Sequence, residues 1–381
     1  MDIILDEIDS EKYFWALYYL ECKTTLLDGA MELAIGQSIG NPNARSTWET
    51  KEMIEDHCAK IYSGSPGFEK NQHQKDGVVW IGFPYANIDW DTDGVSQLMC
   101  MLMGGQMDID NIVQCHLLEI DIDKGKTNFL GPRYGIEGIR QRTGAYNRPL
   151  FGGIIKPKTG ITPVQLLDMT KALVDGGVDF IKEDEILGNP AICPFAERVP
   201  LISDWLEKYA PRVIYTFCIN SDGVEPIIRA HDVHRDGGPG VHLNFWSGLG
   251  MYKALRDENL DLFIHYQKSG DKILTSVRNA YRIDWNVLCE LAGLCGVDFI
   301  HAGMYGGYLS DTEEDLRATF ETLHRHGVMP ALSCGMNADL IAPIAEKFGN
   351  DWMANVGGAI HSDPAGTIAG ARKIRQAIDA L

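Results

Sequence analysis

The sequence lacks three patterns, and each absence excludes a kind of partner, location or structural site. It contains no run of basic residues and its formal net charge is −19, so nucleic acid and anionic membranes are excluded as partners on electrostatic grounds. It contains no apolar run long enough to cross a bilayer. Its nine cysteines are odd in number and form no C-x-x-C motif, which argues against a disulfide framework or a zinc site.

The first residues, MDIILDEIDSEK, are acidic, and no positively charged segment followed by an apolar core is present there. The cysteines are scattered through apolar stretches, as expected for buried thiols in a reducing compartment. We therefore expect a soluble cytoplasmic protein. In so acidic a chain, a small anionic ligand would need a local basic pocket.

What is present is organised around residues 150–185, which read as strand, loop, helix and strand. Short runs rich in glycine or β-branched residues flank the helical segment. Its apolar residues recur at helical spacing and are Val164, Leu167, Met169, Leu173 and Val174. This pattern predicts a βαβ unit.

Ionisable residues stand at the carboxyl ends of both predicted strands. Alternation places Lys156 and Lys158 together after the first strand, and Lys182 and Asp184 together after the second, with Glu185 at its terminus. Charges also collect at ordinary strand ends, but five within two adjacent strands favour a site, because such residues are seldom buried unless paired or ligating.

Strand-like runs alternate with helical runs through the rest of the chain. The eight runs are 151–156, 178–182, 213–219, 240–245, 261–265, 298–302, 329–333 and 352–356. They predict an α/β fold of the (β/α)8 TIM-barrel type, with its active site in the loops after the strands. A doubly wound open sheet is the rival, but a glycine-rich turn would then stand where Lys-Pro-Lys stands.

The segment before the barrel predicts a smaller domain. Strand-like runs cover 13–22, 78–85 and 112–122, and helical patterns cover 26–36, 47–62 and 95–107. We therefore predict a small α+β, ferredoxin-like domain over 1–125, a connector over 126–149, and the barrel with the active site over 150–381.

The loops after the later barrel strands carry further candidate residues. They are His265, His301, Ser333, Gly335, Gly357 and Gly358. Taken singly, a strand-end histidine is more often structural, and a glycine pair more often a tight turn. Glycines after the last two strands of a barrel also match the common phosphate site of this architecture.

Several of these stretches resemble the large subunit of ribulose-bisphosphate carboxylase. They are FLGPRYGIEGIRQRTGAYNRPLFGGIIKPKTGIT, GVDFIKEDE, FIHAG, ALSCGMNA and ANVGGAIHSDPAG. The likeness runs from about residue 94 to residue 381 and is weaker before that. The chain is most similar to the RuBisCO-like proteins, which share the fold and metal site and catalyse other reactions.

The resemblance implies roles for individual residues. Lys182 would take up carbon dioxide as a carbamate, and Asp184 and Glu185 would complete a Mg²⁺ site. Lys156, beside Lys158, would handle the proton of the substrate C–H bond.

Other matches imply contacts to substrate. His265 and His301 match two active-site histidines. The residues that match phosphate or substrate contacts are Ser333, Gly335, Gly357, Gly358, Thr47, Trp48 and Gln106. In the family the Thr-Trp pair comes from the partner subunit, which implies a homodimer with active sites shared between subunits.

Departures from the carboxylase pattern are as informative. Tyr308 stands where carboxylases have a lysine at the tip of the mobile loop after the sixth barrel strand, and Tyr266 where they have an arginine for a second phosphate. Gln106 replaces an asparagine of the N-terminal domain, and the family's glutamate near the Thr-Trp pair is either replaced by Gln37 or lost. The resemblance therefore implies no carboxylation of ribulose bisphosphate.

Within the family, we expect isomerisation of 5-methylthioribulose 1-phosphate in sulfur (methionine) salvage, through a metal-stabilised enediolate. The alternatives are a 2,3-diketo-5-methylthiopentyl-1-phosphate enolase, a decarboxylase of a 3-oxo sugar acid phosphate, and a non-catalytic regulator. The enolases of the family use a lysine of the N-terminal domain, and the region around Gln106 has none. A regulator would not need the costly buried charges of the Lys182 cluster.

Overall fold

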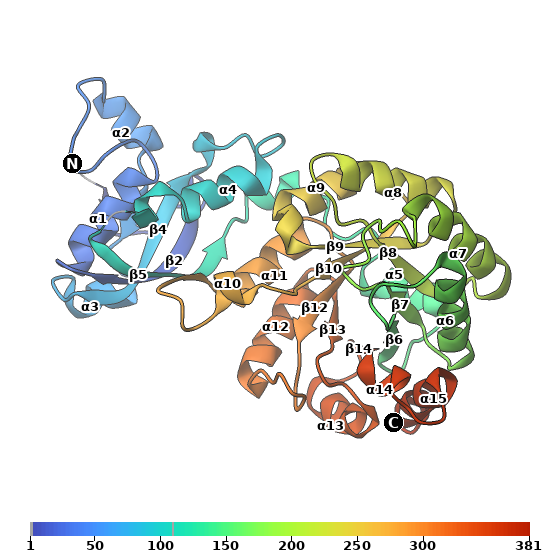
Figure 1. Ribbon diagram of the computed structural model, residues 1–381. Helices are drawn as coiled ribbons and strands as arrows, with labels where there is room; N and C mark the ends of the chain where they lie inside the picture. The colour runs from blue at the N-terminus through green and yellow to red at the C-terminus, as the bar shows by residue number, and fades with distance from the viewer. Residues whose placement is uncertain (1–2, 109) are drawn as a thin grey trace. The chain divides into compact units, whose positions relative to one another are not determined.

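The computed structural model describes residues 3–108 and 110–381 (Figure 1). The chain divides into two compact units. The first contains the chain up to Phe129 together with Gly270–Leu291, and the second contains Leu130–Ser269 and Ala292–Leu381. The predicted domain bounds stay a prediction, and residues 270–291 belong to the first unit.

The first unit is built on a six-stranded mixed sheet of order β1-β3-β4-β2-β5-β11. Its strands are β1 (Ile4–Leu5), β2 (Tyr13–Cys22), β3 (Lys60–Tyr62), β4 (Asp76–Pro84), β5 (Ile112–Asp121) and β11 (Tyr281–Ile283). The central strand β2 pairs antiparallel with β4 and β5, and β11 extends the sheet by pairing parallel with β5. The long strands predicted at 13–22, 78–85 and 112–122 are confirmed.

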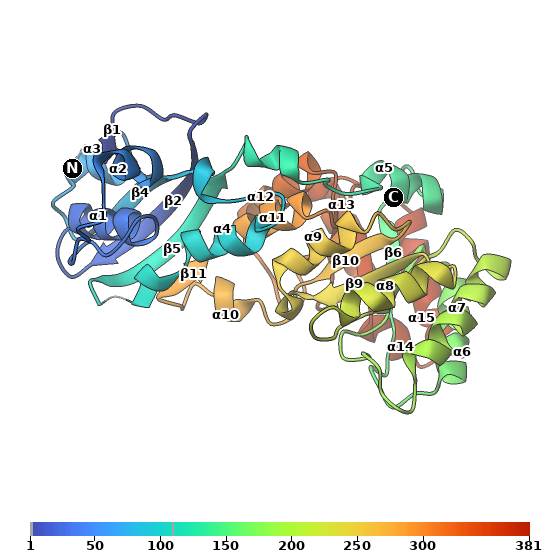
Figure 2. The same cartoon turned by 90° about the horizontal axis from the view of Figure 1, so that it is seen from above.

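Helices pack against this sheet. They are α1 (Leu26–Gly36), α2 (Lys51–His57), α3 (Pro66–Asn71), α4 (Gly94–Leu102) and α10 (Lys272–Thr275). Helix α1 contacts β2, β3 and β4 (Figure 2). It begins with a capping box in which the Thr25 hydroxyl accepts from the Asp28 amide and the Asp28 carboxylate accepts from Thr25. One helical prediction, 47–62, is too long, because the chain turns at Cys58 and enters β3.

The second unit is a closed barrel of eight parallel strands, as predicted (Figure 1). In barrel order they are β10 (Phe263–Gln267), β12 (Phe299–Gly303), β13 (Met329–Leu332), β14 (Met353–Val356), β6 (Leu150–Ile154), β7 (Phe180–Lys182), β8 (Ile214–Cys218) and β9 (Gly240–Asn244). The predicted strand ends differ from these by no more than two residues.

The main helices of this unit surround the barrel (Figure 1). They are α5 (Gly135–Thr143), α6 (Pro163–Asp175), α7 (Phe195–Tyr209), α8 (Glu225–Arg235), α9 (Leu249–Asp257), α12 (Glu313–Arg325), α13 (Ala338–Phe348), α14 (Gly358–His361) and α15 (Thr367–Asp379), while α11 (Trp285–Leu294) begins in the first unit. In α6 the predicted apolar stripe is wrong in part, since Val164 is exposed. The buried stripe is Leu166, Thr170 and Leu173, at the i, i+4, i+7 spacing of a helix face.

The barrel interior changes from apolar to polar along its strands, because inward-facing side chains recur at every second position. Phe180 and Phe299 lie in a buried apolar layer closed by Ile139 of α5. Two residues further along the same strands come Lys182 and His301. The apolar layer holds the barrel together, and the polar layer lies at the carboxyl ends of the strands, where barrels carry their active sites.

Candidate active site

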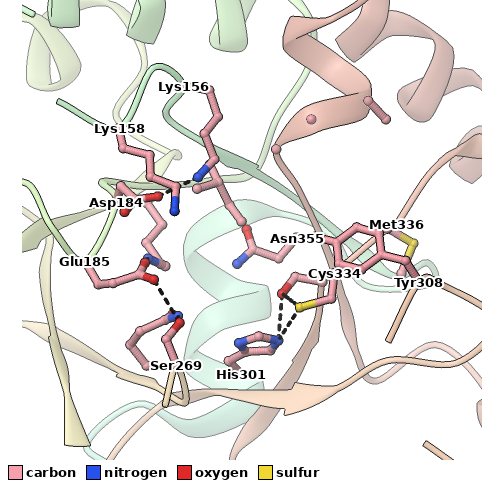
Figure 3. Close-up of a pocket in the computed structure, with 18 of the residues that line it drawn as sticks. Lys156, Lys158, Asp184, Glu185, Ser269, His301, Tyr308, Cys334, Met336 and Asn355 are labelled. Carbon is pink, nitrogen blue, oxygen red and sulfur yellow. Dashed lines mark hydrogen bonds and ion pairs between the residues drawn. The ribbon is translucent and has the colours of Figure 1, made fainter. Parts of the chain in front are cut away.

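A cavity of about 380 Å³ opens at the carboxyl ends of the barrel strands (Figure 3). It is lined only by residues of the second unit. The lining includes eleven of the residues singled out from the sequence: Lys156, Lys158, Lys182, Asp184, Glu185, His301, Tyr308, Ser333, Gly335, Gly357 and Gly358. The fold therefore brings these groups together from five strand ends into one pocket.

Two lysine–carboxylate pairs lie on one side of this pocket. Lys156 Nζ contacts Asp184 Oδ2 at 2.5 Å, and Lys182 Nζ lies 3.5 Å from Glu185 Oε2. Asp184 and Lys182 are each 1% exposed, so neither charge is screened by bulk water. The buried Asp184 and the partly exposed Glu185 thus each have a lysine side chain beside them.

Lys182 is suited to react with carbon dioxide. Its Nζ donates a hydrogen bond to the Glu183 carbonyl oxygen at 2.9 Å. Burial lowers the pKa of Lys182, which favours the neutral amine that carbamate formation requires.

Mg²⁺ prefers hard oxygen ligands, and the side chains of the pocket supply some of them. Among the residues that the structure describes, no group of three or more His, Cys, Asp and Glu side chains is placed to hold a metal ion. Asp184 and Glu185 supply two carboxylates, and a carbamate on Lys182 would add the third oxygen donor. The site therefore fits Mg²⁺ when Lys182 is modified.

Neighbouring polar groups fix the position of Glu185. Its Oε1 accepts from the Ser269 hydroxyl at 2.8 Å, and its carbonyl oxygen accepts from the Asn220 side chain. Gln267 in turn donates to Ser269. Burial raises the pKa of Glu185, but the charge of Lys182 and the Ser269 hydrogen bond bring it down to about 2. Glu185 is therefore an ionised, oriented ligand candidate.

Behind the site, a fully buried ion pair supports strand β7. Arg198 of α7 donates to both carboxylate oxygens of Glu183, at 2.9 and 3.1 Å, and to the carbonyl oxygens of Leu187 and Gly188. Both side chains are 0% exposed. Glu183 stands between two predicted metal ligands and faces the opposite way, so this pair holds the strand end from outside the barrel.

The opposite side of the pocket is uncharged (Figure 3). Ser333 Oγ and His301 Nε2 lie 2.6 Å apart, and burial lowers the pKa of His301 to about 3. Lys268, whose charge also disfavours protonation of His301, is not a lining residue. Lys182, which lines the same pocket, also disfavours protonation of His301, and the lining of the described pocket contains no arginine.

Two predicted substrate contacts of the barrel lie elsewhere. His265 is 0% exposed, stacks on Phe180 and Phe299 below the pocket, and is not a lining residue. Tyr266 points outward, because alternation along β10 turns His265 and Gln267 inward, and it stacks on Tyr252 of α9. His265 therefore stays a predicted substrate contact that the pocket lining does not include, and Tyr266, the predicted departure from the carboxylase arginine, packs on α9.

The residues predicted from the N-terminal domain belong to the first unit. Thr47 is exposed and Trp48 is 85% exposed. Gln106 is 3% exposed and packs against Gly36 of α1. Gln37 donates to the carbonyl oxygens of Cys100 and Met101, so its side chain joins α1 to α4.

Several lining residues were not singled out from the sequence. They include Gln267, Ser269, Cys334, Met336, Asn337 and Asn355. Alternation along β10 and β14 could have indicated Gln267 and Asn355, since each stands two residues beyond an inward-facing apolar or aromatic position. Ser269 and Met336 lie in loops, where no periodic signal exists.

Known proteins with similar sequences belong to the family that the sequence resembles. Residues 135–326 match the family described as ribulose bisphosphate carboxylase large chain, catalytic domain. An uncharacterised ribulose bisphosphate carboxylase-like protein of Bordetella bronchiseptica is 30% identical, over 96% of this chain and 92% of its own length. A 2,3-diketo-5-methylthiopentyl-1-phosphate enolase of Geobacillus kaustophilus is 28% identical, over 96% and 92%.

A 3-oxo-isoapionate-4-phosphate decarboxylase of Rhizobium rhizogenes is 31% identical, over 79% of this chain and 74% of its own length. Among solved structures, the octameric ribulose-1,5-bisphosphate carboxylase/oxygenase of Pyrococcus horikoshii superposes with a TM-score of 0.90 at 25% identity. That superposition covers 99% of this chain and 90% of the other.

Among the described residues, no helix is both long and apolar enough to cross a membrane.

Proposed function

Because the chain belongs to the ribulose bisphosphate carboxylase large-chain family, among its RuBisCO-like members, we propose that it is a Mg²⁺-dependent enzyme that transfers protons on a phosphorylated ketose. The observation that carries the proposal is the meeting of Lys182, Asp184 and Glu185 with Lys156 at one barrel mouth. A metal-activated carbonyl compound beside a lysine is the arrangement that enolisation needs.

The metal would be held by carbamylated Lys182, Asp184 and Glu185. When bound, Mg²⁺ supplies a Lewis acid that makes the C–H bond next to a carbonyl more acidic. The protein supplies the orientation, because Ser269 and Asn220 fix Glu185 and the Arg198–Glu183 pair fixes the strand behind it.

Lys156 is the proposed base. Its Nζ lies in the pocket and pairs with Asp184 Oδ2 at 2.5 Å. Lys156 takes the C–H proton as a neutral amine and can return it to a neighbouring carbon, which gives isomerisation. His301 and Ser333 then position an oxygen of the substrate by hydrogen bonds at the far side.

The proposed substrate is 5-methylthioribulose 1-phosphate. Gly335, Gly357 and Gly358 line the pocket and expose backbone to a phosphate, and Lys158 adds a positive charge. A side chain at Gly357 would approach Lys156 Cε to 3.3 Å, so glycine keeps this edge open. The uncharged lining around His301 suits a thioether tail.

Two related reactions are the alternatives, and each has a relative that favours it. The diketone phosphate enolase is 28% identical and the 3-oxo acid phosphate decarboxylase is 31% identical. We favour the isomerase because no lysine stands between Asp93 and Lys124, the region from which the enolases of the family take their base.

Solvent exchange tests the proposal. The protein, Mg²⁺ and bicarbonate are incubated in deuterium oxide with 5-methylthioribulose 1-phosphate, the diketone phosphate or a 3-oxo acid phosphate. Mass spectrometry then reports deuterium in substrate or product. Isomer formation with deuterium wash-in supports the first choice. Carbon dioxide release or enol formation selects an alternative, and no exchange in any mixture contradicts the proposal.

We also propose a homodimer in which Thr47 and Trp48 of a second copy complete the phosphate site. The 85% exposure of Trp48 supports this in one respect, because its side chain is accessible to a second copy.

A monophosphate is expected to bind at least as tightly as the matching bisphosphate. The pocket has a glycine-rich edge for one phosphate, and the lining around His301 offers no guanidinium for a second. Isothermal titration calorimetry with ribulose 5-phosphate and ribulose 1,5-bisphosphate checks this. Clearly tighter bisphosphate binding would contradict the assignment.

Carboxylation of ribulose bisphosphate is expected to be absent. Tyr308, which lines the pocket, cannot supply the positive charge that a loop lysine offers to a new carboxylate. Losing one stabilising group commonly costs about 3–4 kcal/mol of transition-state stabilisation. Acid-stable radiolabel from bicarbonate measures the reaction, and Tyr308→Lys alone should not create it.

A further inference from the structure

Cys334 occupies an unusual position in the turn after β13. Its φ is +70°, a left-handed conformation that a residue with a side chain seldom adopts, and Gly335 follows with φ +106°. Glycine would be the easier residue at position 334. The side chain nevertheless lines the pocket, on the same side as Met336 and Tyr308 (Figure 3).

The thiol group has only weak partners. Cys334 Sγ lies 3.9 Å from His301 Nε2 and 3.8 Å from Ser333 Oγ. The shorter contact of 2.6 Å joins Ser333 and His301 to each other. The Tyr308 side chain also forms a hydrogen bond with Cys334. The turn therefore places the sulfur among polar groups that line the pocket.

A second observation on the same pocket points to a ligand. Asn355 is 2% exposed, lines the cavity, and its Oδ1 has no hydrogen-bond partner in the described structure. A Cβ at Gly152 would lie 2.8 Å from this oxygen, so glycine leaves room for the amide. A buried acceptor without a donor is costly, and a hydroxyl of a bound molecule would satisfy it.

The loop after β12 closes over the same point. A side chain at Gly307 would collide with the Cys334 carbonyl oxygen, and one at Gly335 would lie 2.8 Å from the Tyr308 amide. Two glycines thus allow the Tyr308 loop to lie directly on the Cys334 turn. Tyr308 and Cys334 therefore meet at one edge of the pocket.

We propose that Cys334 is a ligand-contacting thiol at the uncharged side of the pocket, which a bound sugar monophosphate shields and a thiol-directed electrophile can modify. The inference rests on the proposed function only in the choice of sugar monophosphates as test ligands. It requires that such a ligand binds, and it does not require turnover. According to this inference, Cys334 contacts the hydroxyl groups and the uncharged tail of the ligand.

Alkylation of the native, full-length protein with iodoacetamide tests the inference. The Cys334 sulfur forms a bond to the acetamide carbon, iodide leaves with the electrons of the broken carbon–iodine bond, and the thiol proton passes to solvent. Peptide mass spectrometry gives the rate at each cysteine, with Mg²⁺ and bicarbonate present, without ligand and with a panel of pentose and hexose monophosphates that includes 5-methylthioribulose 1-phosphate.

Cys100 is the internal control, because it is the exposed cysteine of α4 in the first unit. Seven other cysteines are buried and should react slowly in every sample. We expect at least one monophosphate, at about ten times its Kd, to slow alkylation of Cys334 about tenfold, since only the unliganded fraction reacts. Alkylation of Cys100 should not change.

The outcomes separate this inference from the proposed function. Shielding by any member of the panel supports the inference, even when deuterium exchange fails and the proposed reaction is wrong. No shielding by any member, or equal slowing at Cys100 and Cys334, overturns it. Cys334→Gly, which relieves the left-handed backbone, should keep its melting temperature and change the ranking of the panel by Kd, measured by calorimetry, whereas Cys100→Ser should leave that ranking unchanged.

Discussion

Replacing Asp184 by asparagine is expected to reduce turnover at least about 100-fold, the scale at which loss of one preorganised charge-stabilising group is felt. The change keeps the shape of the side chain and removes its charge. Asp184 is buried at the pocket and pairs with Lys156, so the variant loses a metal ligand candidate and frees the proposed base at once. Turnover against Mg²⁺ concentration, with calorimetric Mg²⁺ binding, measures the effect.

The matched control is Asp168→Asn on α6. Asp168 also pairs with a lysine, Lys171, at 3.0 Å, but both side chains are exposed and neither lines the pocket. This control should keep full activity and the same metal affinity. Circular dichroism should show an intact barrel in both variants. Full activity of Asp184→Asn, or of the metal-stripped enzyme, would contradict the metal site.

Replacing Arg198 by methionine is expected to lower the free energy of unfolding by about 3–5 kcal/mol, because it leaves the Glu183 carboxylate buried without its cation. Glu183 would keep only the hydrogen bonds from the Tyr215 hydroxyl and the Cys218 amide. Chemical denaturation measures the loss. The end of β7 should also loosen, so Mg²⁺ affinity should fall together with stability.

Arg235→Met is the control for this second prediction. Arg235 pairs with Asp232 and Asp236 on the surface, where ion pairs contribute about 0–1 kcal/mol. The double variant Glu183→Met with Arg198→Met should recover part of the lost stability, since no buried charge is then unpaired. An Arg198→Met protein as stable as Arg235→Met would show that the buried pair does not support the strand.

The barrel could be predicted from the sequence because its signal is repeated. Each buried strand is a short apolar run, and a helical pattern follows it. Because this alternation repeats, a misplaced end of one predicted strand does not change the predicted fold. The pocket residues followed from the same rule, since Lys156, Lys182 and His301 stand at or just after strand ends. The family resemblance added roles that spacing alone does not give.

The failures have equally local causes. Tyr266 and His265 are adjacent, and only the pleat of β10 decides which one faces inward. His265 faces inward but lies one layer too deep for the pocket. The strand Lys60–Tyr62 was missed because three residues are too few for a period to show. Cys334 lies in a turn, and the direction of a turn side chain cannot be derived from periodicity.

The excursion of residues 270–291 has a consequence for how the molecule can be divided. The polypeptide leaves the barrel after β10, adds β11 to the edge of the N-terminal sheet, and returns before β12. The two units are therefore joined by three covalent crossings and not by one hinge peptide. Cleavage at Leu130 would release neither piece in complete form, because the N-terminal fragment would lack its sixth strand. A genetic exchange that replaces the barrel segment would therefore also replace β11, the sixth strand of the N-terminal sheet.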